Sequence, residues 1–290
     1  MFTSPSWSRS CLVRMDAPAR QRLGSDARDK MAPRFTVLMY HRLESPACPV
    51  LDAVEKPWAI PVTEFEMQMK RLHETNRAGV SMDQIHRALV AGTPVPESWV
   101  GITFDDGNAS DYQHALPILA QYGFRATFFI CGERITGEMP PAHVRALHAG
   151  GMHIGSHAMR HMFMTTLDAA SEEAELLGSR EVLEGIIGAP VDHFAPPGGR
   201  WSRRTERALK RAGYVAVSSS RYGFNRSDKA SFSYGRMPIV RATSMYTFDA
   251  MVRADRGKLW SGYARSGILG TARFLLGESV YGHARAWKKG

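Results

Sequence analysis

From residue 34 onward the sequence alternates short apolar runs with amphipathic stretches, and this alternation limits the possible folds more than any other feature. The runs at 35–40, 99–104 and 126–130 are rich in β-branched and aromatic residues, which favour strands. Between such runs apolar residues recur at helical spacing, as in 63–77. Strands that alternate with helices predict a parallel sheet with helices packed outside it.

Capping motifs and glycines delimit the predicted helices. Thr63 with Glu66, and Ser81 with Gln84, have the spacing of capping boxes, and Gly188 closes a long acidic helix. Further helices are predicted at 109–121, 140–149, 168–187 and 202–212, and further strands at 152–154, 193–195 and 214–217. In such folds catalytic residues gather where strands end and loops begin, at the carboxyl edge of the sheet.

The net charge of +9 is unevenly distributed along the chain. Residues 1–30 have a net charge of +3, residues 251–290 have +6, and residues 31–250 hold 23 basic and 23 acidic side chains. A nucleic-acid-binding domain usually carries basic charge across its working face. The distribution therefore argues against nucleic acid as a partner, and the basic excess is typical of solvated ends.

Two adjacent aspartates, Asp105 and Asp106, follow the predicted strand 99–104 in the motif Thr-Phe-Asp-Asp-Gly. Side chains alternate along an extended chain, so the two carboxylates point in different directions. One can bind a cation while the other faces a substrate. The alternative is a simple turn, because Asp-Gly pairs are common in turns.

A pair of histidines, His157 and His161, follows the predicted strand 152–154. On a helical turn this spacing places both imidazoles on one side, where they can converge on one metal. Taken alone, such a pair more often belongs to a surface or a core. With Asp106 it supplies the three N and O ligands of a catalytic zinc site that keeps an open position for water. Asp105 then lies beside the metal as a candidate general base.

A stiff loop, Ala-Pro-Pro-Gly-Gly-Arg at 195–200, follows the next predicted strand. Its prolines restrict the backbone, and its glycines allow a ligand to approach closely. We expect Pro197, Gly198 and Arg200 to contact the substrate or its oxyanion, with the backbone N–H of Gly198 as a donor. A purely structural loop is the alternative.

The motifs at 103–107 and 156–161 and the Pro-Pro-Gly-Gly loop, in this order, resemble the signature of the polysaccharide deacetylases, the NodB-homology or carbohydrate esterase family 4 enzymes. The resemblance spans about residues 34–241, and the opening Val-Leu-Met-Tyr-His-Arg at 37–42 is similar to the exopolysaccharide-type branch. It implies a deformed (β/α) barrel and N-acetylated glycan substrates. It also implies a divalent metal, expected to be zinc, held by Asp106, His157 and His161, with Asp105 as the base.

The chain departs from the family pattern at several points. Ala195 stands where the family has an arginine that pairs with the base, and Gly198 where it has a tyrosine. The Leu-x-His motif that supplies a general acid near the C-terminus is not visible. Arg200 is a candidate replacement for the arginine. His41, at the end of the first predicted strand, is a candidate for the acid, with a structural role as the alternative.

The expected function is metal-dependent hydrolysis of N-acetyl groups on a poly- or oligosaccharide, with release of acetate. A non-catalytic carbohydrate-binding homologue is one alternative, which the departures support. A deacylase of O-acetyl esters or non-sugar amides is another, because the motifs act on the carbonyl and not on the sugar. A retaining glycosidase fits poorly, since it needs two carboxylates about 5–5.5 Å apart and not a metal-binding histidine pair.

Three regions are expected: a disordered N-terminal extension (1–33), the deacetylase domain (34–250) and a basic amphipathic helical extension (251–290). The scattered N-terminal arginines are followed by no apolar segment of a secretory signal, which leaves Met1 or Met31 as the start and favours a cytoplasmic or membrane-peripheral location. Segment 258–290 predicts either a helix packed on the barrel or a contact with a membrane or a polysaccharide-assembly partner.

Overall fold

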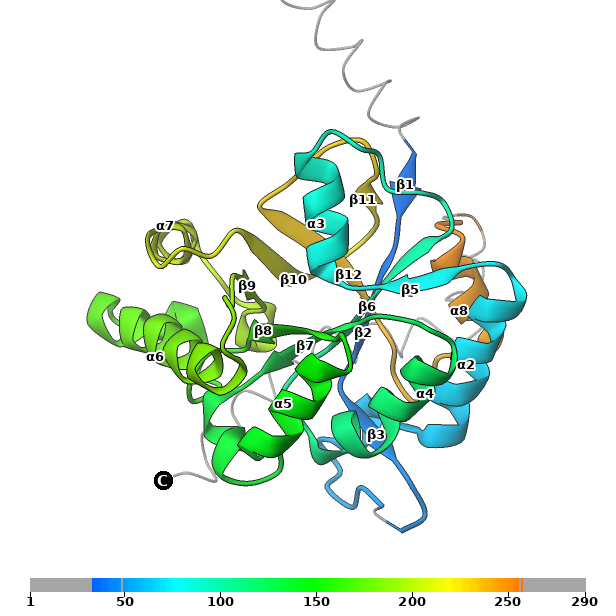
Figure 1. Cartoon of the computed structure of the whole chain (residues 1–290), viewed down its shortest axis with the longest axis horizontal. Helices are drawn as coiled ribbons and strands as arrows, with labels where there is room; N and C mark the ends of the chain where they lie inside the picture. The colour runs from blue at the N-terminus through cyan, green and yellow to red at the C-terminus, as the bar shows by residue number, and fades with distance from the viewer. Residues whose placement is uncertain (1–32, 48, 256, 258–290) are drawn as a thin grey trace, which may run out of the picture. The chain divides into compact units, whose positions relative to one another are not determined.

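The computed structural model describes residues 33–47, 49–255 and 257. Its strands are β1 (Arg34–Phe35), β2 (Val37–Tyr40), β3 (Arg42–Glu44), β4 (Ala59–Pro61), β5 (Ala78–Val80), β6 (Trp99–Phe104), β7 (Thr127–Ile130), β8 (His153–Ser156), β9 (His193–Phe194), β10 (Ala216–Tyr222), β11 (Asn225–Arg226) and β12 (Ser233–Pro238). Seven of them form a closed parallel ring in the order β2-β12-β10-β9-β8-β7-β6, which β6 closes by pairing with β2 (Figure 1). The predicted deformed (β/α) barrel is confirmed.

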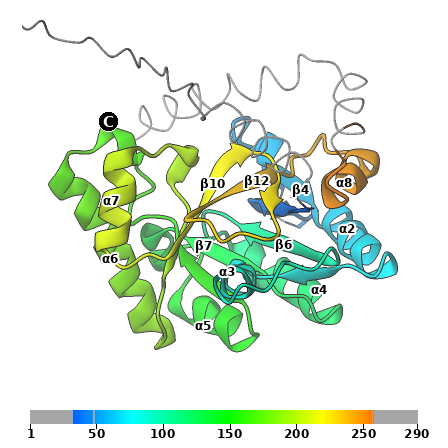
Figure 2. The ribbon, with the colours of Figure 1, turned by 90° about the horizontal axis from the view of Figure 1, so that it is seen from above.

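The longer helices are α2 (Val62–Glu74), α3 (Met82–Val90), α4 (Leu116–Gln121), α5 (Pro141–Ala149), α6 (Ala169–Ile187), α7 (Arg203–Arg211) and α8 (Met245–Val252). Short helical turns are η1 (Lys56–Trp58), η2 (Asp111–Ala115), η3 (Gly132–Thr136), η4 (Met164–Thr166) and η5 (Pro197–Gly199). The helices surround the strands in both ribbon views (Figures 1 and 2). Within the part of the chain that the structure describes, no helix has the length and apolarity that crossing a bilayer requires.

Helix ends follow the local sequence in most places. The capping box of Ser81 and Gln84 opens α3, and Gly188 ends α6 in the left-handed conformation with a φ of 66°. The capping box predicted for Thr63 is wrong. The chain enters α2 directly from β4, and the N-cap residue is Pro61, whose side chain has no oxygen to accept a backbone N–H.

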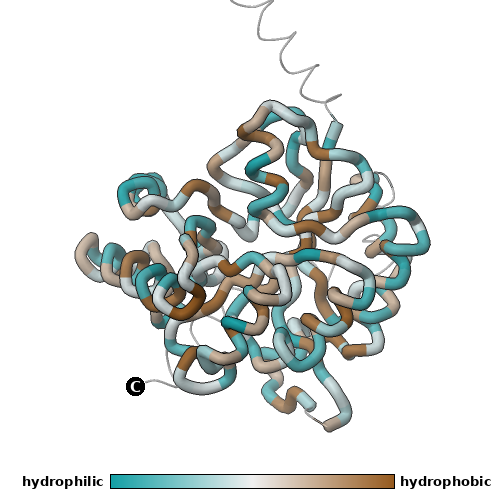
Figure 3. The backbone as a smooth tube through the Cα atoms, in the orientation of Figure 1, coloured by the Kyte–Doolittle hydropathy of each residue, from teal (hydrophilic) through white to brown (hydrophobic). Residues whose placement is uncertain are grey.

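Alternation along the strands divides the buried side chains into two layers. Outward-facing residues of β2, β6 and β7 pack beneath the helices; this layer includes Leu38, Tyr40, Phe65, Met69, Ile102, Phe104 and Phe128. Inward-facing residues fill the barrel, where a Cβ on Gly155 would lie 2.5 Å from the Phe129 ring. Figure 3 shows hydrophobic segments along the central strands and hydrophilic ones on the outer turns.

Two predicted regions lie outside the described residues. These are the N-terminal extension at 1–33, of which only residue 33 is described, and the segment 258–290. The predictions made for them stay predictions.

Candidate active site

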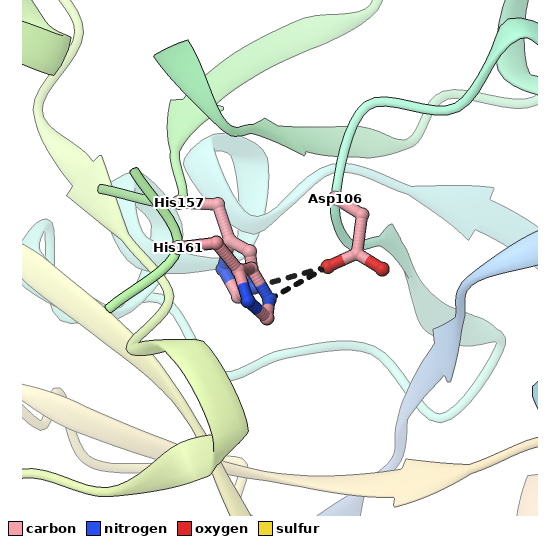
Figure 4. Close-up of side chains that lie close together, drawn as sticks. All are labelled: Asp106, His157 and His161. Carbon is pink, nitrogen blue, oxygen red and sulfur yellow. Dashed lines mark ion pairs between the residues drawn. The ribbon is translucent and has the colours of Figure 1, made fainter. Parts of the chain in front are cut away.

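Three side chains from distant parts of the sequence meet at the carboxyl ends of the barrel strands. Asp106 follows β6, and His157 and His161 follow β8. The Nε2 atoms of His157 and His161 lie 3.3 and 3.1 Å from the same carboxylate oxygen of Asp106, Oδ1 (Figure 4). The ligand atoms of this trio lie within 4.8 Å of one another. The predicted convergence of two imidazoles and one carboxylate is therefore present.

The two histidines lie on a loop and not on the predicted helical turn. Ala158 and His161 have φ values of 63° and 57°, which break any helix between them. The buried carboxylate of Glu175, on α6, accepts the backbone N–H groups of Met159 and Arg160 at 2.9 and 2.7 Å. These hydrogen bonds hold the loop in the shape that turns both imidazoles inward.

The orientation of His157 is set from its far side. Its Nδ1 lies 2.8 Å from the carbonyl oxygen of Ala195, so the N–H of Nδ1 donates there and Nε2 faces Asp106. Metal-binding histidines commonly make such a contact through the nitrogen that does not bind the metal. The third motif thus contributes to the site through its backbone at Ala195.

The donor set fits a divalent metal such as zinc. Two imidazole nitrogens and one carboxylate oxygen are the ligands of many catalytic zinc sites, which leave a position open for water. The side chains of Asp106, His157 and His161 are only 13%, 3% and 11% exposed, so an ion here would lie largely out of bulk water. Burial raises the pKa of Asp106, but hydrogen bonds from the two histidines lower it by more, and the net pKa lies well below its usual value.

Asp105 is not part of this trio and is held by a buried arginine. Arg236, on β12, donates to both carboxylate oxygens of Asp105, with Nη1–Oδ1 and Nη2–Oδ2 distances of 2.6 and 2.8 Å. Burial raises the pKa of Asp105, but the charge of Arg236, together with that of His157, lowers it by more, so the pKa lies below its usual value. Asp105 is therefore an ionised carboxylate with a fixed direction.

Sequence reasoning missed Arg236 and assigned its place to Arg200. The structure corrects this: the guanidinium of Arg200 lies 4.7 Å from the ring centre of Phe163, and Arg236 pairs with Asp105. Arg236 stands at an inward-facing position of β12 with its side chain 0% exposed, which only the folded structure shows. A cation buried this deeply needs an anionic partner. The family pattern has its arginine at the position of Ala195, and in this chain Arg236, from β12, pairs with Asp105 instead.

The third motif packs against an aromatic ring. Gly198 has a φ of 60°, and a Cβ on it would lie 2.4 Å from the Cε1 atom of Phe163. Phe163 thus occupies the space that a side chain at 198 would need, which gives a physical reason for glycine where the family has tyrosine. Pro197 is buried in the same short turn, η5, and the loop lies directly after β9 at the carboxyl edge.

His41 lies at the same edge, directly after β2. Its Nδ1 is buried and has no hydrogen-bond partner among the described residues, and its ring lies 4.5 Å from the ring of Trp58. Burial lowers the pKa of His41, against the carboxylates of Asp106 and Asp105, which raise it. The net pKa of His41 lies below its usual value, and the backbone carbonyl oxygens of His41 and Asp105 share the side-chain amide of Asn108.

Asn108 links the first two barrel strands of the site, and sequence reasoning did not predict this. Its side-chain N–H groups donate to the carbonyl oxygens of His41 and Asp105 at 3.2 and 3.3 Å. Its side-chain oxygen accepts from Arg42 at 2.8 Å. The amide therefore fixes the residues that follow β2 and β6 relative to each other.

A closed parallel barrel with its titratable side chains at the carboxyl ends of the strands defines the class of (β/α) barrel enzymes. The sequence model of the polysaccharide deacetylases matches residues 92–217. Over these residues the chain matches the polysaccharide deacetylases, and its similarity to this family supports a deacetylase enzyme.

Known proteins agree with this assignment. YxkH of Bacillus subtilis, whose name assigns it provisionally to the polysaccharide deacetylases, is 25% identical over 223 residues, which are 76% of this chain and 77% of that protein. The peptidoglycan-N-acetylglucosamine deacetylase of Bacillus cereus is 33% identical over 125 residues, 43% of this chain and 57% of the relative. The deacetylase PplD of Streptococcus pyogenes, solved with acetate, has the same fold, with a TM-score of 0.68 at 20% identity over 77% of this chain and 98% of that one.

Proposed function

We propose that this chain hydrolyses the N-acetyl groups of an N-acetylated poly- or oligosaccharide of the exopolysaccharide or chitooligosaccharide type, with zinc as its metal. The observation that carries the proposal is the separation of two carboxylates: Asp106 faces His157 and His161, while Asp105 is held apart by Arg236. One carboxylate is thus available to bind a metal and the other to handle a proton. The name of the Bacillus cereus relative, which specifies N-acetylglucosamine, supports the sugar class.

The metal, when bound by Asp106, His157 and His161, would lower the pKa of a water molecule and polarise the acetyl carbonyl. Asp105 accepts a proton from the attacking water. Its two oxygens offer about four lone-pair positions, of which Arg236 uses two. The pairing with Arg236 leaves room for this step and keeps the carboxylate ionised.

The remaining groups act on the oxyanion and on the leaving nitrogen. The backbone N–H of Gly198 would donate to the oxyanion, and such a donor is typically worth about 3–4 kcal/mol in the transition state. His41 would give a proton to the nitrogen as the C–N bond breaks, so that the products are acetate and a free amino sugar. Pro197 and Arg200 would contact the sugar beside this point.

The test is an acetate-release screen with purified protein and added zinc or cobalt. The panel contains chitooligosaccharides, poly-N-acetylglucosamine, peptidoglycan and, as the O-acetyl comparison, acetylxylan. We expect acetate from an N-acetylated glycan, loss of turnover with retained metal in Asp105→Asn, and loss of metal in His161→Ala. The matched control is His148→Ala, an exposed histidine of α5, which should change neither. Release from acetylxylan alone would refute N-deacetylation, and full turnover by Asp105→Asn would remove Asp105 as the base.

A further inference from the structure

A second group of metal-ligand side chains lies at the amino-terminal end of the barrel, opposite the active site. His153 is the first residue of β8, His193 is the first residue of β9, and Asp192 precedes it. One ligand atom from each lies within 4.8 Å of the others. Neither the sequence motifs nor the proposed reaction uses these residues.

Strand alternation separates this group from the active site. His153, Gly155 and His157 all face the barrel interior, because side chains alternate along β8. The ring of Phe129 lies against Gly155, at the level between the two histidines. Four residue steps of about 3.3 Å place His153 and His157 roughly 13 Å apart. One ion cannot be shared between the two ends.

The contacts within the group suit a tetrahedral ion. Asp192 Oδ1 lies 2.8 Å from His193 Nδ1 and 3.9 Å from His153 Nε2. An ion bound by N and O donors at about 2.0–2.2 Å holds neighbouring donors about 3.4 Å apart, which falls between these two distances. The other nitrogen of His153, Nδ1, lies 3.2 Å from the hydroxyl of Thr127. That contact fixes the ring as the outer contacts of metal-binding histidines do.

Hydrogen bonding within the protein leaves this group incompletely satisfied. The 3.9 Å between His153 Nε2 and Asp192 is too long for a hydrogen bond. His193 is 1% exposed, and its Nδ1 makes a hydrogen bond of 2.8 Å with Asp192 Oδ1, which an ion bound between these two atoms would replace.

The surroundings allow an ion to enter. The side chains of His153 and Asp192 are 16% and 30% exposed, so solvent reaches the group from one side. His86, on α3, faces it as well, with its ring centre 5.5 Å from that of His193. Its Nδ1 lies 3.0 Å from the hydroxyl of Tyr234, on β12. His86 or water would fill a fourth position.

We propose that His153, Asp192 and His193 form a second site, for a divalent transition metal of the zinc type. Imidazole and carboxylate donors in a tetrahedral arrangement select such ions over magnesium or calcium, which prefer oxygen ligands. An ion at this point would tie the start of β8 to the start of β9. Its role is to stabilise the barrel, and it does not depend on the proposed reaction.

Metal stoichiometry tests the proposal in the full-length protein. The active-site trio is first disabled in an Asp106→Ala/His161→Ala variant, which is stripped with a chelator and dialysed against zinc. We expect wild type to bind two zinc ions per chain and this variant to bind one. Adding His153→Gln and Asp192→Asn should remove the remaining ion and abolish the zinc-dependent rise in melting temperature. His148→Gln in the same background is the control and should keep it.

The outcomes separate this proposal from the proposed function. A folded Asp106→Ala/His161→Ala variant that binds no zinc overturns the second site and leaves the reaction intact. His153→Gln/Asp192→Asn alone should still release acetate at the wild-type rate with one zinc bound. If the variant with all four substitutions fails to fold, cobalt is added to the Asp106→Ala/His161→Ala variant instead. The visible absorption of a tetrahedral N/O complex is expected, and its absence overturns the proposal.

Discussion

Arg236 and Asp105 form a bidentate ion pair inside the barrel, joining β12 to the end of β6 across 131 residues of sequence. The guanidinium also donates to Thr103 Oγ1 and to the carbonyl oxygen of Ser219, at 3.2 Å in each case. The pair therefore fixes the direction of the carboxylate and also links three strands. Bidentate arginine–carboxylate pairs are among the strongest and most directional side-chain contacts.

Arg236→Met should lower both activity and stability. It leaves Asp105 buried without its cation, which typically costs about 3–5 kcal/mol. We expect kcat/KM to fall by about 10²–10⁴-fold, because Asp105 loses its orientation and its charge is no longer favoured. Arg236→Lys keeps the charge but loses the two parallel hydrogen bonds of the guanidinium. Its activity and stability should lie between those of Arg236→Met and wild type. Urea unfolding and acetate release measure both effects, and wild-type turnover by Arg236→Met would contradict the role of the pair.

Glu175→Ala should weaken metal binding without touching a ligand. The Glu175 carboxylate holds the backbone of Met159 and Arg160, between His157 and His161. Loss of such outer contacts commonly reduces metal affinity by about 10–100-fold. Zinc titration with a competing chelator measures the change.

Glu172→Ala is the matched control for this experiment. Glu172 is equally buried on the same helix, but it pairs with Arg204 and not with the histidine loop. We expect this variant to lose stability and to keep its zinc affinity. Equal affinity losses in the two variants would show that the effect comes from α6 as a whole.

The barrel and its ligand trio could be predicted because their signals are local. Strand–helix alternation marks the class of fold, and the segments that carry Asp106, His157 and His161 follow the predicted strands 99–104 and 152–154. Arg236 could not be placed, since its partner depends on β12 pairing with β2, and a strand containing glycine, arginine and proline is a weak strand signal.

The helical turn predicted for the histidine pair failed for a similar reason. The spacing of His157 and His161 is compatible with a helix, but a carboxylate from α6 captures the intervening backbone N–H groups. Spacing alone does not show this tertiary contact. The two side chains still converge with Asp106, because a loop with positive φ values turns them together as a helical turn would.

Asp111→Asn should stabilise the protein in alkaline solution. Burial raises the pKa of Asp111 well above its usual value, and the nearby charge of Asp106 raises it further. A carboxyl group whose pKa is higher in the folded protein than in the unfolded one, where it is about 3.9, stabilises the fold at pH values below the unfolded pKa. This contribution to stability is lost as the pH rises through the folded-state pKa. The carboxylate of Asp111 accepts the backbone N–H of Asn108 at 3.0 Å. Asparagine removes the charge, and its side-chain oxygen can still accept this N–H. We expect a higher melting temperature than wild type at pH 8 and a shrinking difference towards pH 4.

Asp168→Asn is the control of opposite sign for this pH series. The backbone N–H of Ser171 lowers the pKa of Asp168, an exposed residue that caps α6. The contribution of Asp168 to stability is present above its unfolded-state pKa and is lost as the pH falls through its folded-state pKa. The variant should therefore melt slightly below wild type at pH 8 and match it in acid. An Asp111→Asn variant that is less stable than wild type at pH 8 would show that the carboxylate is stabilised by its surroundings.

His41→Gln separates the proposed acid from a structural role by its dependence on the leaving group. An amine must be protonated to leave, so kcat/KM on an N-acetyl glycan should fall by about 10²–10⁴-fold. An activated aryl acetate needs no proton on its leaving oxygen, so its hydrolysis should fall far less. Asp105→Asn is the comparison and should slow both substrates, because both need the attacking water to lose a proton. Equal losses on the two substrates in His41→Gln would assign His41 to packing against Trp58, whose ring lies 4.5 Å away.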